Sequence, residues 1–384
     1  MGAGGRDALP TPYGVGEPRL RAFSQGTTRR DDGSTAQPPS ARHRWWPTLF
    51  SDHPFIPMKK RRWGVMAATL AAAALVALLG PRTRFEERWN EPEIGSDVEA
   101  YLAARESSVS NLRTGEAKAV VWADPETRTR TPIALVYLHG YSADRHEVDP
   151  LVSRIAEPLG ANVFYMRLTG HGRDAAAMAE ATVEAWMDDV AEAVAVGVTL
   201  GDRVVLVGTS TGGTLAVWAA AREEVAGRVA ALAVISPNFR LRDTSSRILL
   251  WPWGAQVAGL VVGAERCFEP QNAEQELHWT ECYPTSALLP MMALVEHVRT
   301  MPLDGVTVPT VVAYSREDAV VDPEETRLAF GRLGSSRKQL VEISGSEDPA
   351  RHVIAGDIMS PVTTDELARS ILAFLRLTPG LQGR

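Results

Sequence analysis

A serine between two glycines lies directly after an aliphatic run. The segment 208–212 has the form Gly-x-Ser-x-Gly, and it follows the apolar residues 204–207. Gly208 and Gly212 lack a Cβ atom, so the chain can turn sharply from a strand into a helix there. Such a turn leaves the central residue, Ser210, strained and exposed above a sheet edge. This context favours a nucleophilic serine over the alternative, a glycine-rich turn that only packs a helix on a strand.

A carboxylate suited to orient a catalytic base occurs later in the chain. A serine hydroxyl is a weak nucleophile until a base removes its proton, and a third group must orient that base. Asp318 lies just past the strand expected at 310–314, at a sheet edge where ligands gather. We therefore predict Asp318 as the acid. Glu317 and Asp322 are neighbouring alternatives, and a helix-capping role for these carboxylates also stays open.

The predicted base is a histidine near the end of the chain. His352 follows the strand expected at 339–343, between a polar loop and an apolar helical start, and no other histidine lies after Asp318. The chain order is then serine, acid, histidine, which is the order expected of a catalytic triad whose serine lies at such a strand-to-helix turn. The other seven histidines precede the acid: His43, His53, His139, His146, His171, His278 and His297.

Two backbone amides are expected to face the reacting carbonyl oxygen. A tetrahedral oxyanion needs fixed donors, namely the N–H after the nucleophile and one N–H from the loop after an earlier strand. Thr211 and Tyr141 occupy those places. The pair His139 and Gly140, at the end of the strand expected at 132–138, would turn the Tyr141 amide inward.

These residues require a scaffold of alternating strands and helices. Apolar runs flanked by turn residues predict a mostly parallel sheet with helices on both faces. The alternation breaks at 238–301, which predicts an insert. The strands are expected at 117–122, 132–138, 162–165, 203–207, 229–235, 310–314 and 339–343, and the helices at 147–159, 182–200, 212–222, 323–333 and 363–377.

The N-terminal part of the chain has a different composition. Residues 1–57 are rich in Gly, Pro, Arg and Ser, so we expect them to be disordered or absent from a mature product that starts at Met58. Four basic residues at 59–62 precede an uncharged run at 63–81, long enough to approach the thickness of a bilayer. Residues 58–82 are therefore predicted to be a transmembrane anchor, and a buried helix of the soluble domain is the alternative.

The basic residues before the uncharged run predict its orientation. Under the positive-inside rule they stay cytoplasmic, so the catalytic domain would lie on the extracytoplasmic, periplasmic side. The run ends Ala77-Leu78-Leu79-Gly80-Pro81, whose large residues and proline disfavour signal-peptidase cleavage. We expect an uncleaved anchor, with residues 63–80 in the membrane.

Charge and cysteine content exclude several other functions. A net charge of −7 argues against nucleic-acid binding, which relies on clustered basic residues. No motif for a metal, nucleotide or flavin matches the serine motif in quality, so no cofactor is predicted. The two cysteines, Cys267 and Cys282, lie in the insert. An exported domain meets oxidising conditions, which favours a disulfide between them, with two separate buried thiols as the alternative.

Together these motifs resemble those of the α/β-hydrolase superfamily over about residues 115–377, and most closely those of monoacylglycerol lipase and lysophospholipase-like serine hydrolases. Where many members carry Gly before the acid, this chain has Ser315-Arg316-Glu317, and threonines flank Ser210 where His and Met or Gln are frequent. The resemblance rests on His139, Gly140, Gly170, His171, Gly172, Gly208, Ser210, Gly212, Asp318 and His352.

The resemblance implies an α/β-hydrolase fold with an inserted cap and a triad that cleaves acyl esters. An acyltransferase with the same triad and an inactive membrane-tethered binding protein remain alternatives. The expected organisation places the disordered segment at 1–57, the anchor at 58–82, a linker at 83–114, the first core part at 115–237, the cap at 238–301 and the second core part at 302–384.

Overall fold

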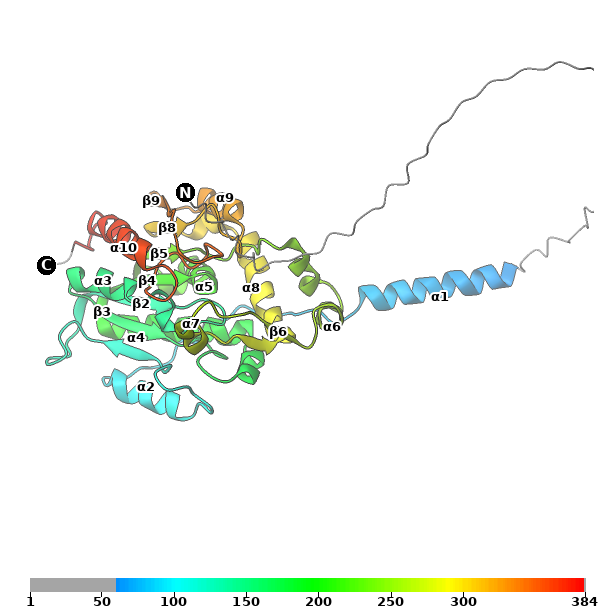
Figure 1. Ribbon diagram of the computed structural model, residues 1–384, viewed down its shortest axis with the longest axis horizontal. Helices are drawn as coiled ribbons and strands as arrows, with labels where there is room; N and C mark the ends of the chain where they lie inside the picture. The colour runs from blue at the N-terminus through cyan, green and yellow to red at the C-terminus, as the bar shows by residue number, and fades with distance from the viewer. Residues whose placement is uncertain (1–59, 383–384) are drawn as a thin grey trace, which may run out of the picture. The chain divides into compact units, whose positions relative to one another are not determined.

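The computed structural model describes the backbone of residues 60–382 and the side chains of residues 63–382 (Figure 1). The segment predicted to be disordered or absent, 1–57, lies outside the described residues. The helices of the described part are α1 (Lys60–Leu78), α2 (Val98–Ser107), α3 (Leu151–Ala156), α4 (Val183–Leu200), α5 (Thr211–Ala220), α6 (Gly254–Val261), α7 (Ala273–His278), α8 (Leu288–Thr300), α9 (Pro323–Arg332) and α10 (Pro361–Arg376).

A seven-stranded sheet forms the centre of the catalytic part, in the order β1-β3-β2-β4-β5-β8-β9. The edge strand β1 runs antiparallel to β3, and the other neighbours are parallel. The predicted mostly parallel sheet is therefore confirmed. Its strands are β1 (Ala119–Val121), β2 (Thr131–Leu138), β3 (Asn162–Met166), β4 (Gly201–Thr209), β5 (Val229–Ile235), β8 (Thr310–Tyr314) and β9 (Lys338–Glu342).

Alternating side chains of the central strands bury both faces of the sheet. In β2, Leu135 and Tyr137 enter the core that holds side chains of α3 and α10. Val136 and Leu138 enter the opposite core with side chains of α4, α5 and α8. A strand buried on both faces must be apolar throughout, which explains the continuous aliphatic runs of β2 and β4.

Two segments differ from the sequence-based expectation. The helix expected at 147–159 is shortened to α3 with a 3₁₀ turn on each side. Pro150 and Pro158 interrupt it, because proline has no amide hydrogen to donate within a helix. The predicted linker 83–114 contains α2, whose buried side chains include Val98 and Leu102. This helix is short and has few apolar residues, so the sequence shows no clear amphipathic period there.

The helix α1 falls within the predicted anchor at 58–82, and its side chains from Trp63 to Leu78 are exposed. Among the residues that the structure describes, no helix has the length and apolarity needed to cross a membrane. The anchor stays a prediction.

The chain between β5 and β8 holds α6, α7, α8 and a small antiparallel pair, β6 (Glu265–Cys267) and β7 (Cys282–Pro284). A disulfide joins Cys267 to Cys282 across this pair. It closes a loop of 15 residues that includes α7. The bond therefore restrains the part of the insert that faces the loop after β2.

We expect the double change Cys267→Ser and Cys282→Ser to lower the free energy of unfolding by up to about 3 kcal/mol, because the unfolded chain gains the entropy of the opened loop. Thermal unfolding with and without reductant measures the effect. Reductant should lower the melting temperature of the wild type and leave the double variant unchanged. Equal melting temperatures of the oxidised wild type and the double variant would contradict the expectation.

Candidate active site

Ser210 stands at the junction of β4 and α5, with the backbone angles φ 50° and ψ −115°. This positive φ is unusual for a residue with a side chain and strains the turn. A Cβ atom on Gly208 would lie 2.5 Å from the Gly212 carbonyl oxygen, and one on Gly212 would lie 2.0 Å from the Leu138 carbonyl oxygen. Both glycines are therefore required by close backbone approach.

The structure brings Ser210, His352 and Asp318 together. The serine Oγ lies 3.0 Å from His352 Nε2, and His352 Nδ1 lies 2.8 Å from Asp318 Oδ2. With Nδ1–H donating to the carboxylate, Nε2 is left to accept the serine hydroxyl proton. The three side chains come from the loops after β4, β9 and β8, at the carboxyl ends of parallel strands.

The geometry separates Asp318 from its two neighbouring alternatives. The other oxygen of Asp318 accepts hydrogen bonds from the amides of Val320 and Val321, both at 2.8 Å, which fixes the carboxylate. Asp322 caps the N-terminus of α9 and pairs with an arginine. Glu317 is exposed and lies 3.6 Å from an arginine nitrogen. Of the three carboxylates, Asp318 is the one hydrogen-bonded to His352.

A second carboxylate holds the histidine loop. Asp348 Oδ2 accepts hydrogen bonds from the backbone amides of His352 and Val353 at 2.8 and 2.9 Å. Burial alone lowers the pKa of His352. The charge and hydrogen bond of Asp318, together with the charge of Asp348, outweigh burial, and the net result is a raised pKa.

The loop after β2 lies beside the serine. A Cβ atom on Gly140 would lie 3.4 Å from Ser210 Cβ, so the backbone of Gly140 passes close to the nucleophile. Tyr141 is the next residue in the chain, and its backbone amide therefore lies near the reaction centre. Within the described chain, the Tyr141 and Thr211 amides make no hydrogen bond to another group. Thr211 is the first residue of α5, where a helix leaves its amides free. Both amides are therefore available as donors.

His139 and His171 brace this loop instead of taking part in proton transfer. His139 Nε2 accepts from the Leu168 amide at 3.0 Å, and His171 Nε2 accepts from the Ser142 amide at 3.1 Å. Burial lowers the pKa of His139 to about 4 and that of His171 well below its usual value. Both rings are neutral at pH 7, and they tie the β2 loop to the β3 loop.

Glu147, a buried carboxylate under the same loop, was not predicted from the sequence. Its Oε1 accepts from the Gly140 amide at 2.5 Å and from the Tyr137 hydroxyl at 2.6 Å. Burial raises the pKa of Glu147 to about 8. No motif marked this residue, since its partners become neighbours only when β2 and the following turn are formed.

We expect Glu147→Ala to lower kcat by about 10- to 100-fold, because the Gly140 amide loses its acceptor and the Tyr141 amide is no longer held in place. Steady-state kinetics on an activated ester measure the change. Glu147→Gln, which keeps an oxygen acceptor, should recover part of the rate. An alanine variant with unchanged kcat would show that the loop does not depend on this carboxylate.

Comparison with known proteins assigns the chain to a family. A family model described as serine aminopeptidase, S33, matches residues 130–357, more than half of the chain. The chain belongs to this family. A curated relative, the thermostable monoacylglycerol lipase of Bacillus sp. (strain H-257), is 25% identical over 233 residues, which cover 58% of this chain and 86% of the relative. The predicted family resemblance and the prediction of a lipase- or esterase-type hydrolase are confirmed.

Solved structures support the fold. A structure from work on LipS and LipT, two metagenome-derived lipolytic enzymes, superposes with a TM-score of 0.55 at 24% identity and covers 68% of this chain and 98% of its own. A soluble variant of monoglyceride lipase from Saccharomyces cerevisiae gives 0.51 at 12% identity, covering 67% and 90%. At these identities the likeness establishes the α/β-hydrolase fold alone.

Proposed function

We propose that this protein is a serine hydrolase that cleaves carboxylic esters through an acyl-enzyme, with Ser210 as nucleophile, His352 as general base and acid, and Asp318 as its orienting carboxylate. The observation that carries the proposal is the unbroken contact from Ser210 Oγ to His352 and on to Asp318, at 3.0 and 2.8 Å. This arrangement supplies what a serine hydroxyl needs to become reactive at neutral pH.

The reaction follows from the positions of these atoms. His352 Nε2 takes the hydroxyl proton as Ser210 Oγ attacks the ester carbonyl carbon. The amides of Tyr141 and Thr211 stabilise the resulting oxyanion. The imidazolium returns its proton to the departing alcohol, which leaves an acyl-serine. Water, deprotonated by His352, attacks this ester and releases the carboxylic acid and the free serine.

An acyl chain is the substrate group that we propose for this enzyme. The insert exposes large apolar side chains, among them Trp251, Leu260 and Val261. Ser210 and His352 are only 7% and 9% exposed, so the reaction centre is shielded from water. The similarity to a monoacylglycerol lipase supports monoacylglycerols as the ester class.

A substrate panel tests the proposal. The purified protein is incubated with p-nitrophenyl esters and monoacylglycerols of graded chain length, and with the matching p-nitroanilides because the family model is described as an aminopeptidase. Ester hydrolysis well above anilide hydrolysis is expected. Turnover only when an acceptor alcohol is added would indicate an acyltransferase, and no turnover of any substrate would favour a binding protein.

The pH dependence follows from the raised pKa of His352. The ring must be neutral to accept the serine proton, so kcat/KM falls as pH decreases through this pKa. We expect the acid midpoint above the ordinary value of 6.5. Asp318→Asn removes the charge that stabilises the imidazolium and should move the midpoint to lower pH. Glu317→Gln, at an exposed position, should leave it in place.

We further propose that residues 58–82 anchor the protein in a membrane, with the catalytic domain on the extracytoplasmic side. The uncharged run 63–81 and the basic residues before it support this topology. The Cys267–Cys282 disulfide is consistent with an oxidising compartment. A C-terminal reporter that is active only in the cytoplasm should stay inactive, and strong reporter activity would reverse the topology.

A further inference from the structure

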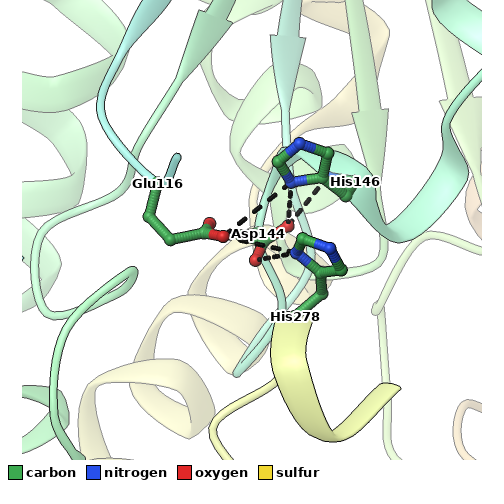
Figure 2. A group of neighbouring side chains, drawn as sticks. All are labelled: Glu116, Asp144, His146 and His278. Atoms are coloured by element: carbon green, nitrogen blue, oxygen red, sulfur yellow. Dashed lines mark hydrogen bonds and ion pairs between the residues drawn. The ribbon is translucent and has the colours of Figure 1, made fainter. Parts of the chain in front are cut away.

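Four metal-ligating side chains from three separate segments meet beside the loop that carries Tyr141. Glu116 precedes β1, Asp144 and His146 follow β2, and His278 ends α7 of the insert. One ligand atom from each lies within 4.8 Å of the other three (Figure 2). All four side chains point toward a common centre. None of them takes part in the proposed ester cleavage.

The spacing of these atoms fits a single small cation. His278 Nδ1 lies 3.0 Å from Asp144 Oδ2 and 3.3 Å from Glu116 Oε1. His146 Nδ1 lies 3.0 Å from Asp144 Oδ1 and 3.9 Å from Glu116 Oε1. Ligands about 2.0–2.1 Å from a tetrahedral ion lie about 3.3–3.4 Å from one another. The separations between the donor atoms run from 3.0 Å to no more than 4.8 Å, so the widest pairs must close by up to about 1.4 Å before all four donors enclose such an ion.

The burial of the carboxylates provides independent support. The side chains of Glu116 and Asp144 are only 2% and 3% exposed. Glu116 Oε2 is buried and has no hydrogen-bond partner within the described chain. The guanidinium of Arg113 stands 3.9 Å from Asp144, beyond hydrogen-bond distance. A buried carboxylate oxygen without a partner is costly, and a cation in the cluster would satisfy it once the Glu116 carboxylate binds the ion through Oε2 as well as Oε1.

We propose that Glu116, Asp144, His146 and His278 form a binding site for a divalent transition metal, with Zn²⁺ as the best match. Imidazole nitrogens and carboxylate oxygens are both accepted ligands of Zn²⁺, and two of each would fill the four positions of a tetrahedral shell. Ca²⁺ and Mg²⁺ prefer shells of oxygen ligands and more of them, so they fit this cluster poorly.

The metal would fasten the insert to the oxyanion loop. His278 belongs to the loop closed by the disulfide, while Asp144 follows Tyr141 by three residues. The two segments already touch, because the Thr280 amide donates to the Ser142 carbonyl at 2.7 Å. A bound ion adds a second, stronger link at the same place. The site is structural and does not depend on which ester the enzyme cleaves.

Metal titration of the full-length, tag-free protein tests the site. After removal of metals by a chelator, Zn²⁺ is titrated by calorimetry, and Co²⁺ is added as a spectroscopic probe of tetrahedral geometry. The test variants are His278→Gln and Glu116→Gln, and the matched control is His297→Gln on the insert helix α8, outside the cluster. Circular dichroism and serine labelling by a fluorophosphonate establish that each variant is folded.

We expect one Zn²⁺ per chain, a tetrahedral Co²⁺ spectrum, and a melting temperature raised by about 5 °C at 100-fold excess over the dissociation constant. Each test variant should bind Zn²⁺ at least 10-fold more weakly, and His297→Gln should bind as the wild type does. Absence of Zn²⁺ binding by the wild type, or binding unchanged in both folded test variants, would overturn the proposal and leave the cluster as a network of ion pairs.

Discussion

Ser210→Ala should reduce ester turnover by about five to six orders of magnitude, because no other group can form the acyl-enzyme at this position. The oxyanion amides of Tyr141 and Thr211 remain, so a small residual rate above the uncatalysed reaction is expected. Initial rates on a p-nitrophenyl ester, measured at high enzyme concentration, determine the loss. The same variant should lose all labelling by a fluorophosphonate probe.

The matched control is Ser245→Ala, at an exposed serine of the insert. It should retain both the wild-type rate and full labelling. Thermal unfolding of the two variants checks that the alanine at position 210 has not disrupted the fold, since the serine side chain occupies a strained turn. A folded Ser210→Ala protein that keeps full labelling would mean that another residue is the nucleophile.

Asp318→Asn should lower kcat by about four orders of magnitude. The carboxylate accepts from His352 Nδ1, whereas an amide offers a donor as well as an acceptor and favours the wrong ring tautomer. The Val320 and Val321 amides can still bond to the asparagine oxygen, so the loop should keep its shape. Steady-state kinetics and circular dichroism on the same preparation separate loss of chemistry from loss of fold.

Two neighbouring carboxylates supply the controls for this variant. Asp322→Asn keeps a side chain that can cap α9, and Glu317→Gln changes only an exposed group. Both should retain kcat within about threefold. If Asp322→Asn proves the more damaging change, the orienting acid is misassigned.

Residues that follow the ends of strands were the most predictable part of the site. The aliphatic run of β4 and the glycines near its end place Ser210 at the turn from this strand into α5. Asp318 and His352 could be expected at the same sheet edge because parallel strands end together. The sequence favoured Asp318 as the acid but left Asp322 as an alternative. The decision between them required the contact with His352 and the arginine that pairs with Asp322.

Features built from distant segments could not be predicted. Glu147 gains its role only when its carboxylate lies under the Gly140 amide. The cluster of Glu116 and His278 joins residues 162 positions apart, with no ligand spacing that resembles a metal motif. No metal site was accordingly predicted from the sequence. Periodicity records which face of an element is buried, but it carries no information on which polar side chains the fold brings together.

Rapid-quench mass spectrometry on a p-nitrophenyl ester tests the central claim most directly. A covalent acyl-enzyme on Ser210 is the intermediate that separates this mechanism from direct attack by water. Quenching in acid during the first turnover should reveal a fraction of protein heavier by one acyl group, with the modification mapped to the peptide that contains Ser210. Turnover with no acylated protein at any quench time, or an acyl group mapped to a different residue, would contradict the proposed mechanism.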